Sequence, residues 1–189
     1  HPATLSLRSR PIHYVLSREG SPDFLKALAQ VVTRKEGLKV IVLDASADLE
    51  GGGPWQTYRG EEALNGAVVE LFGELVRRHN TAKDILDQGG KPPVYPPVLY
   101  LVNGANDLFA KLSDDGKDKP HVLLDKCTVS LGVFFLLAEP ASGVSAFSFR
   151  PWFKKQAVFQ NALWVGDGIS DQFHLKVRSS ARQLYESIG

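Results

Sequence analysis

The sequence of 189 residues contains a single cysteine, Cys127, and no methionine. One cysteine excludes an internal disulfide framework and fits a reducing compartment. We expect Cys127 to be a small buried residue rather than a nucleophile. The chain begins at His1 and Pro2, and together with the lack of methionine this indicates a piece of a longer protein.

The sequence also lacks an excess of charge of one sign and a long apolar run. Its 22 basic and 21 acidic residues leave a net charge of +1, so nothing favours binding to nucleic acid or to a membrane surface. No apolar run is long enough to cross a bilayer, and no signal peptide is visible. His13, His79, His121 and His174 lack the spacing of metal ligands, and we expect each at the surface or at a cap.

What the sequence does contain is a strand, a tight turn and a helix in immediate succession. Ile12, Tyr14 and Leu16 alternate with other strand-forming residues. Ser21 can cap the helix that follows, and Pro22 suits its first position. This order is the layout of a phosphate-binding loop, which reads G-x-x-x-x-G-K-[ST].

The chemistry of that loop is missing. Gly20 takes the place of its last glycine, Ser21 that of the lysine and Pro22 that of the hydroxyl residue. Pro22 has no N–H for a phosphate, and Asp23 puts a carboxylate where the helix N-terminus would attract an anion. We therefore expect no strong nucleotide binding. The alternative is an ordinary capped connection between a strand and a helix.

The remaining elements alternate between strands and helices. Three continuous apolar runs are predicted as strands buried on both faces, and two shorter strands follow: residues 38–44, 98–102 and 132–138, then 163–165 and 173–177. Helices are predicted at residues 60–80, 106–112, 122–130 and 180–188, with a loop at 45–59 and a linker at 81–97. This alternation predicts a mostly parallel sheet covered by helices on both faces.

The helix predicted at residues 60–80 has the clearest period. Its apolar stripe is expected to be core and consists of Ala63, Leu64, Ala67, Val68, Leu71, Phe72, Leu75 and Val76. Glu74 and Arg78 lie four residues apart on a polar side, where they can form an ion pair.

Several stretches in order resemble one family, the FtsK/SpoIIIE-type ATPase domains, and most closely the last ATPase domain of the EssC-type motor of type VII secretion. They are KVIVLDASADL, EEALNGAVVELFGELVRRHNTA, PPVLYLVNGANDL, LGVFFLLAEP and ALWVGDGISDQFHLKV. The resemblance implies one α/β domain over residues 1–189. Its fold would be the RecA-like P-loop NTPase fold, with a mostly parallel central sheet and helices on both faces.

The stretch PPVLYLVNGANDL resembles the Walker B segment with both carboxylates replaced. Asn103 stands where the family has the aspartate that orders Mg²⁺, and Gly104 where it has the glutamate that activates water. Each loss costs roughly 10²-fold or more in rate. We therefore expect no catalytic residues, no metal site and no bound cofactor in this domain, although the family uses ATP and Mg²⁺.

The resemblance implies a role in protein interactions. The family's last ATPase domain is linked to recognition of secreted helical-hairpin substrates and to regulation of neighbouring ATPase domains. The expected partners are secreted substrates and the preceding ATPase domain of the same chain, in an oligomeric motor anchored in the bacterial membrane by its other segments. Candidate contact residues are Trp55, Trp152 and Phe153, because large aromatics dominate interface energy. Alternatively, Trp152 and Phe153 cover the edge of the sheet.

Two other functions remain open at this point. Asp44 ends a strand and GDGISD follows another, as in haloacid-dehalogenase-type Mg²⁺-dependent phosphatases, with Asp167 and Asp171 on the metal. The acid expected two residues after the nucleophile is Ser46, which cannot protonate a leaving group near neutral pH. The second alternative is an active ATPase completed by a neighbouring subunit, for example through an arginine finger.

Overall fold

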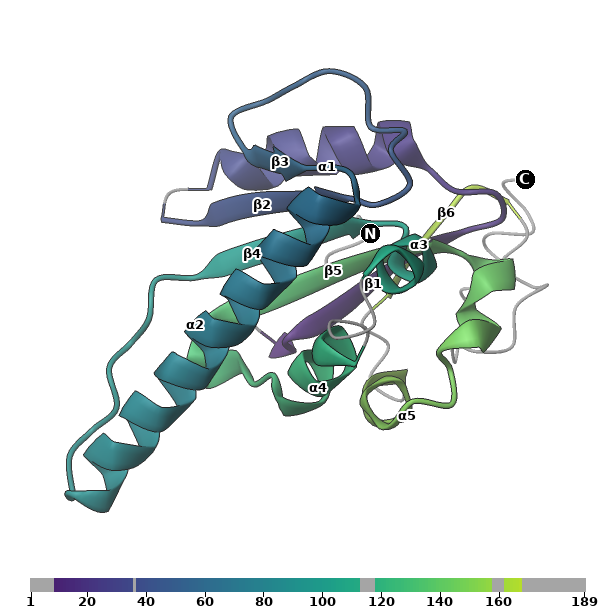
Figure 1. Ribbon diagram of the computed structural model, residues 1–189. Coiled ribbons are helices and arrows are strands. Elements are labelled where there is room, and N and C mark those ends of the chain that lie inside the picture. Colours follow the sequence, from purple (N-terminus) through teal and green to yellow (C-terminus); the bar gives the residue numbers. More distant parts are fainter. Residues whose placement is uncertain (1–8, 36, 113–117, 158–161, 168–189) are drawn as a thin grey trace, which may run out of the picture.

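The computed structural model describes residues 9–35, 37–112, 118–157 and 162–167, which form an α/β structure around one six-stranded sheet (Figure 1). All neighbouring strands are parallel, in the order β3-β2-β4-β5-β1-β6. The strands are β1 (Ile12–Ser17), β2 (Lys39–Asp44), β3 (Gln56–Tyr58), β4 (Val98–Asn103), β5 (Val133–Pro140) and β6 (Ala162–Val165). The expected α/β fold with a parallel central sheet is confirmed.

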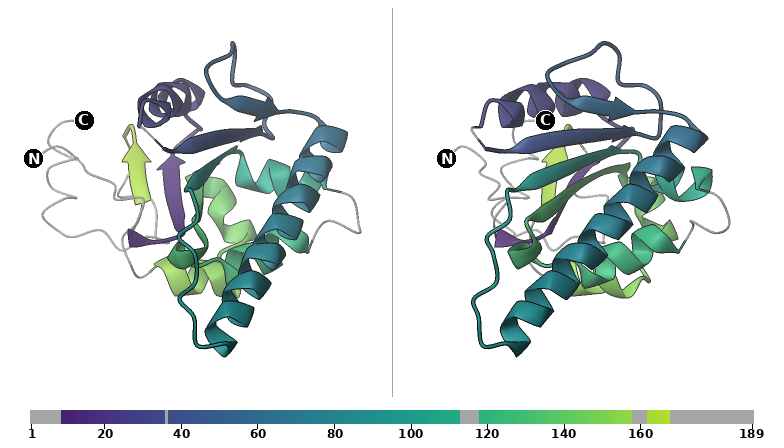
Figure 2. Two further views of the ribbon diagram at one scale, coloured as in Figure 1. Left: turned by 90° about the vertical axis from the view of Figure 1, so that its left-hand side faces the viewer. Right: turned by 60° about the vertical axis from the view of Figure 1, so that its left-hand side comes forward.

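Helices cover both faces of the sheet. One face carries α1 (Pro22–Thr33), and Figure 2 shows it on the opposite side of the sheet from α2 (Glu61–Asp87). The face that carries α2 is also covered by α3 (Ala105–Lys111), α4 (Lys119–Lys126) and α5 (Pro151–Ala157), with 3-10 turns at Val129–Leu131 and Ala141–Ala146.

The central strands are apolar throughout because each face of the sheet has its own core. In β2, Ile41 and Leu43 pack on the α2 side, whereas Val40 and Val42 pack on the α1 side. The same alternation runs through β4 and β5. The continuous apolar runs of the sequence therefore indicated doubly covered strands correctly.

The structure differs from the sequence predictions where packing is weak. β3 lies inside the predicted loop at residues 45–59; it is short and polar, and among the described strands it pairs with β2 alone. α2 continues to Asp87, through the first part of the predicted linker, and its C-terminal half projects beyond the sheet (Figure 1). A helical segment that packs against little has no buried face, so its sequence shows no apolar stripe from which the helix could be predicted. The predicted elements at 173–177 and 180–188 lie outside the described residues.

The stripe of α2 is buried only where the helix contacts the sheet. Leu64, Val68 and Leu71 belong to the core, but Val76 is 42% exposed, so its predicted burial is wrong. Glu74 and Arg78 form the expected ion pair at 2.7 Å. Within the part of the chain that the structure describes, no helix combines the length and apolar character needed to cross a membrane.

Two aromatic residues expected at the surface lie in the core. Trp152 and Phe153 are 1% and 3% exposed, so neither is accessible to a partner in this structure, and their predicted exposure is wrong. Trp152 stacks on Phe147 with ring centroids 5.5 Å apart, and its Nε1 donates to Nδ1 of His121 at 3.2 Å. Trp55 is half-buried against the core beneath α1.

His13, in β1, was predicted to lie at the surface or at a cap, and this prediction is wrong. His13 is fully buried, and its Nε2 lies 2.9 Å from the carbonyl oxygen of Arg10. Cys127 is buried as expected, and burial raises the pKa of its thiol to about 12. A thiol that stays protonated near neutral pH is a poor nucleophile.

The central strand β4 offers a direct test of the packing. Leu101→Ala removes a fully buried side chain from β4 and should lower the free energy of unfolding by about 2–5 kcal/mol. The matched change Leu86→Ala, on the exposed end of α2, should alter it by less than about 0.5 kcal/mol. Urea unfolding followed by circular dichroism measures both. Equal losses would contradict the assignment of Leu101 to the core.

His121 makes the stability depend on pH. Burial, and next the nearby Arg150, lower the pKa of His121 from 6.5 to about 4. The unfolded chain therefore binds the proton more readily, so stability is complete above about pH 6.5 and falls as the pH drops toward 4. His121→Gln keeps an acceptor for Trp152 and should reduce the stability lost between pH 7 and pH 5, measured by urea unfolding. His79→Gln, on the exposed side of α2, should leave that loss unchanged.

Candidate functional site

A small pocket lies where the carboxyl ends of the central strands meet, which is where open parallel sheets place their ligand sites. Its volume is about 70 Å³. It is lined by Ser17, Glu19, Gly20, Ser21, Leu25, Ser46, Asp48, Asn103, Gly104, Ala138, Glu139 and Pro140. The fold thus brings the turn after β1 and the end of β4 together, as the two resemblances to ATPase motifs require.

The turn after β1 satisfies its own polar groups. The N–H of Gly20 donates to Oγ of Ser17 at 2.9 Å, so it is already engaged within the turn. Pro22 is the first residue of α1, and Asp23 is exposed in its first turn. Ser21 precedes the helix, but its side chain makes no capping hydrogen bond, which differs from the expectation.

The amide of Asn103 is held by acidic residues. Its Nδ2 donates to Oδ1 of Asp44 at 2.8 Å and to Oδ1 of Asp48. Asn103 ends β4, and Asp44 ends the neighbouring strand β2, where the two residues are paired in register. The side chain that the resemblance places at the metal-ordering aspartate is therefore engaged by other residues of the protein.

Asp44 is a fully buried carboxylate neutralised by an arginine. Its Oδ2 accepts from Nε of Arg59 at 2.5 Å and from the N–H of Leu49 at 3.3 Å. Arg59 also donates to the carbonyl of Leu49, which ties the loop between β2 and β3 to the end of β2. Sequence reasoning missed Arg59, because nothing local links it to a carboxylate fifteen positions earlier.

Gly104 occupies a position that excludes a side chain. Its φ is +86°, in the left-handed region, and a Cβ there would lie 2.0 Å from Oγ of Ser46. That hydroxyl is fixed, since it donates to Oδ2 of Asp107 at 2.7 Å. A glutamate at position 104 would therefore need a different local backbone.

A third carboxylate at this edge belongs to Glu139, at the end of β5. It accepts from the N–H of Asn106 at 3.0 Å and from its Nδ2 at 3.1 Å. Burial raises the pKa of Glu139, although the hydrogen bonds from Asn106 oppose this. The sequence analysis did not select Glu139 as a site residue. An acidic residue directly after a buried strand could have indicated one, because that strand ends at the edge of the sheet where ligands bind.

The charge of the pocket is negative. Glu19, Asp48 and Glu139 line it, and no lysine or arginine lines it among the residues that the structure describes. In that same part of the chain, no group of three or more His, Cys, Asp or Glu residues is arranged to hold a metal ion. The pocket therefore offers acceptors and glycine backbone, but no group that attracts a phosphate.

The two aspartates of the phosphatase alternative lie on different parts of the sheet. Asp44 ends β2, whereas Asp167 follows β6, and β4, β5 and β1 lie between these strands. At the spacing of neighbouring strands this separation is roughly 19 Å, too far for one magnesium ion. Oδ2 of Asp167 instead lies 3.4 Å from Nη1 of Arg18, with which it forms an ion pair. Asp171 lies outside the described residues. The geometry does not support a phosphatase site.

No protein-family model matches the chain, and no curated protein matches it in sequence. Solved structures do match. The cytoplasmic domain of EssC superposes with a TM-score of 0.74 and 18% identity over 94% of this chain. The fold is that of a type VII secretion ATPase domain.

Two further structures agree with that result. ATPases 2 and 3 of EssC from Geobacillus thermodenitrificans give a TM-score of 0.69 at 17% identity, over 94% of this chain. ATPases 2 and 3 of Thermomonospora curvata EccC, in complex with a signal sequence peptide, give a TM-score of 0.66 at 16% identity, also over 94% of this chain. The matches cover 36%, 33% and 34% of the three longer chains, so this chain spans about a third of their length.

The strained position at the end of β4 can be tested with a pair of glycine substitutions. Gly104→Ala should lower the free energy of unfolding by at least about 1–2 kcal/mol, because alanine is disfavoured in the left-handed region and its Cβ would also displace the Ser46 hydroxyl. Gly66→Ala, in the interior of α2 with open space around it, should raise that free energy by about 0.5–1 kcal/mol. Thermal and urea unfolding measure both variants. An unchanged Gly104→Ala variant would show that the loop adapts at little cost.

Proposed function

We propose that this chain is a degenerate terminal ATPase domain of a type VII secretion motor, without ATP hydrolysis of its own, that acts through protein interactions. The observation that carries the proposal is the pocket at the carboxyl edge of the sheet. It stands where a nucleotide would bind in this fold, yet it measures about 70 Å³ and is lined by three carboxylates. Pockets for ligands of nucleotide size are several times larger, roughly 300–1,000 Å³.

The residues of the pocket do not fit a magnesium nucleotide. Phosphate-binding loops cradle phosphates with free backbone N–H groups and a lysine. Here the N–H of Gly20 is engaged by Ser17, Pro22 has no N–H, and Ser21 carries no charge. Repulsion between Glu19, Asp48 and a triphosphate adds to the cost of binding. An arginine finger from a neighbouring subunit would not provide the missing loop.

Loss of the catalytic groups leaves the scaffold for recognition. We infer that residues 1–189 form one domain of a longer, membrane-anchored protein and that this domain lies on the cytoplasmic side of the bacterial membrane. Matches that cover about a third of multidomain ATPase chains support this arrangement. Its proposed partners are the preceding ATPase domain of the same chain, in an oligomeric motor, and secreted helical-hairpin substrates. The complex of Thermomonospora curvata EccC with a signal sequence peptide supports the second partner.

Calorimetric titration with ATP and Mg²⁺ tests the loss of nucleotide binding. We expect no heat of binding at millimolar ATP and no phosphate release, because the pocket is too small and lacks a cationic group. An Asn103→Asp variant should remain inactive, since it restores only one of several missing parts. The conjugation coupling protein TcpA, a structural neighbour solved with ATPγS, is titrated under the same conditions as the positive control.

Micromolar ATP binding by the unaltered chain would contradict the nucleotide part of the proposal. Fluorescence anisotropy with labelled signal sequence peptides of secreted helical-hairpin proteins tests the recognition part separately. A scrambled peptide of the same composition is its control. Equal binding of both peptides would reject sequence-specific recognition and leave the nucleotide result intact.

A further inference from the structure

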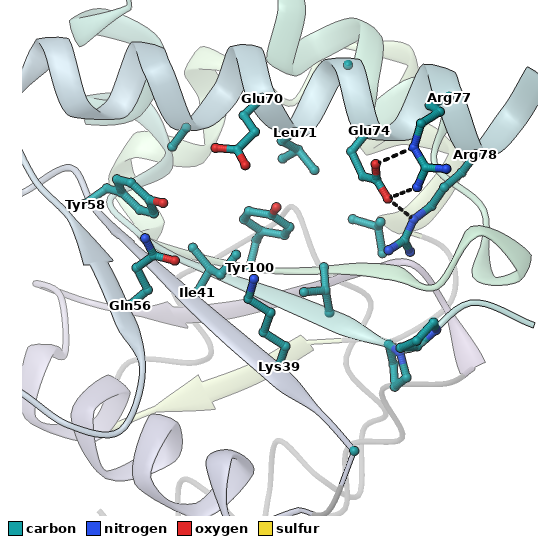
Figure 3. A pocket seen from close by; sticks show the side chains of 17 residues that line it. Lys39, Ile41, Gln56, Tyr58, Glu70, Leu71, Glu74, Arg77, Arg78 and Tyr100 are labelled. Carbon is teal, nitrogen blue, oxygen red and sulfur yellow. Dashed lines mark hydrogen bonds and ion pairs between the residues drawn. The ribbon is translucent and has the colours of Figure 1, made fainter.

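A larger cavity, of about 430 Å³, lies between α2 and the sheet (Figure 3). It is on the face opposite α1 and is lined by β2, β3, β4 and one side of α2. It shares no lining residue with the pocket at the carboxyl edge. Its volume lies within the range of ordinary ligand pockets, roughly 300–1,000 Å³.

One part of the cavity wall is apolar and held in place by the core. Ile41, Leu71 and Val133 contribute buried aliphatic surface. Tyr100 is 9% exposed, and its ring stacks on Phe135 with centroids 5.6 Å apart and planes at 26°. The wall is therefore preformed rather than assembled by a ligand.

Three polar groups meet in the cavity without protein partners. Figure 3 shows the carboxylate of Glu70 pointing in from α2, with the hydroxyls of Tyr58 and Tyr100 on the facing strands. No hydrogen bond or ion pair joins these three side chains to any residue in the described ranges. Burial, and next the charge of Glu70, raise the pKa of Tyr100 to about 12, so its phenol stays neutral. The cavity therefore offers one negatively charged carboxylate and two hydroxyl oxygens, all of which can accept hydrogen bonds.

Two arginines share the neighbouring carboxylate on α2. Glu74 accepts from Nη2 of Arg77 and from Nε of Arg78, both at 2.7 Å. These hydrogen bonds, that from Arg77 first, lower the pKa of Glu74 to about 2. Arg78 also donates to the carbonyl of Leu131 at 2.8 Å, which fixes its position. Glu70 is therefore the carboxylate of the cavity wall that makes no ion pair with a described residue, and the ammonium of Lys39 lies on the sheet side of the same cavity.

We propose that this cavity binds an arginine side chain of a partner polypeptide, with the guanidinium between Glu70 and the two tyrosine hydroxyls. A guanidinium has five N–H donors in one plane, enough for a carboxylate and two phenol oxygens. Its flat face can also lie against a tyrosine ring, as in cation–π contacts. The methylene stem of the arginine covers the aliphatic wall.

The cavity is larger than one side chain, which leaves room for the main chain that carries it. The exposed ammonium of Lys39, on the sheet side of the cavity, can donate to a carbonyl of that main chain (Figure 3). This charge pattern favours a polypeptide arginine over a ligand with a cation alone. This arginine site is separate from the function proposed above, and it does not depend on whether the pocket at the carboxyl edge binds a nucleotide.

Titration of ¹⁵N-labelled protein with N-acetyl-arginine methylamide, followed by NMR, tests the site. The amide signals of Glu70, Leu71 and Tyr100 should shift in a saturable way. The citrulline analogue has nearly the same shape without the charge, and it should bind about tenfold more weakly or worse.

Matched variants locate the interaction. Glu70→Gln should weaken the binding of the arginine probe about tenfold, and Tyr100→Phe roughly threefold to tenfold. Asp84→Asn makes the same change of charge on the exposed part of α2, outside the cavity, and should have no effect. Thermal unfolding shows whether each variant is folded. If Glu70→Gln does not fold, the affinity of Tyr100→Phe for the arginine probe tests the site.

Three outcomes would overturn the proposal. Equal affinity for the arginine and citrulline probes would remove charge as the basis of binding. Equal affinity for N-acetyl-lysine methylamide would show a site for any cation rather than for a guanidinium. Tighter binding of free L-arginine than of the blocked probe would assign the cavity to a free amino acid instead of a polypeptide.

Discussion

The buried carboxylate of Asp44 is the constraint on which the carboxyl edge of this structure depends. It lies at the end of β2 with no exposure to solvent, so its charge must be compensated within the protein. Arg59 supplies the compensation from the position directly after β3, and Asn103 supplies a hydrogen bond from β4. The arrangement fixes the loop between β2 and β3, and it engages the amide of Asn103, which the resemblance places in the Walker B segment.

Under the proposal that no nucleotide binds here, the same edge keeps the architecture of the fold without the ligand. The parallel strands still deliver their carboxyl ends to one place, because strand order and direction depend on the two cores rather than on the nucleotide. What has changed is local. Glu139 and Asp48 face a small pocket, and Gly104 leaves no space for a catalytic side chain.

Much of the fold could be predicted from the sequence, and the misses share a physical cause. The apolar runs of β2, β4 and β5 predicted buried strands, and the period of α2 predicted its helix. β3 and the end of α2 were missed because both have little to pack against, so burial leaves no pattern there. One pocket brings together Gly20, Asn103 and Gly104, which the resemblance singled out, and Glu139, which it did not. Arg59, the ion-pair partner of Asp44, was also missed.

The sequence by itself determined the α/β class, because its continuous apolar strands need a covering layer on each face, and through the resemblance it predicted which residues stand at the ATPase motif positions. Only the tertiary structure decided what surrounds them. It paired Asp44 with Arg59, buried Trp152 beside Phe147, and opened a cavity beneath α2 in which Glu70 faces two tyrosines. These contacts join segments far apart in the chain, so they depend on how the layers pack rather than on any local pattern.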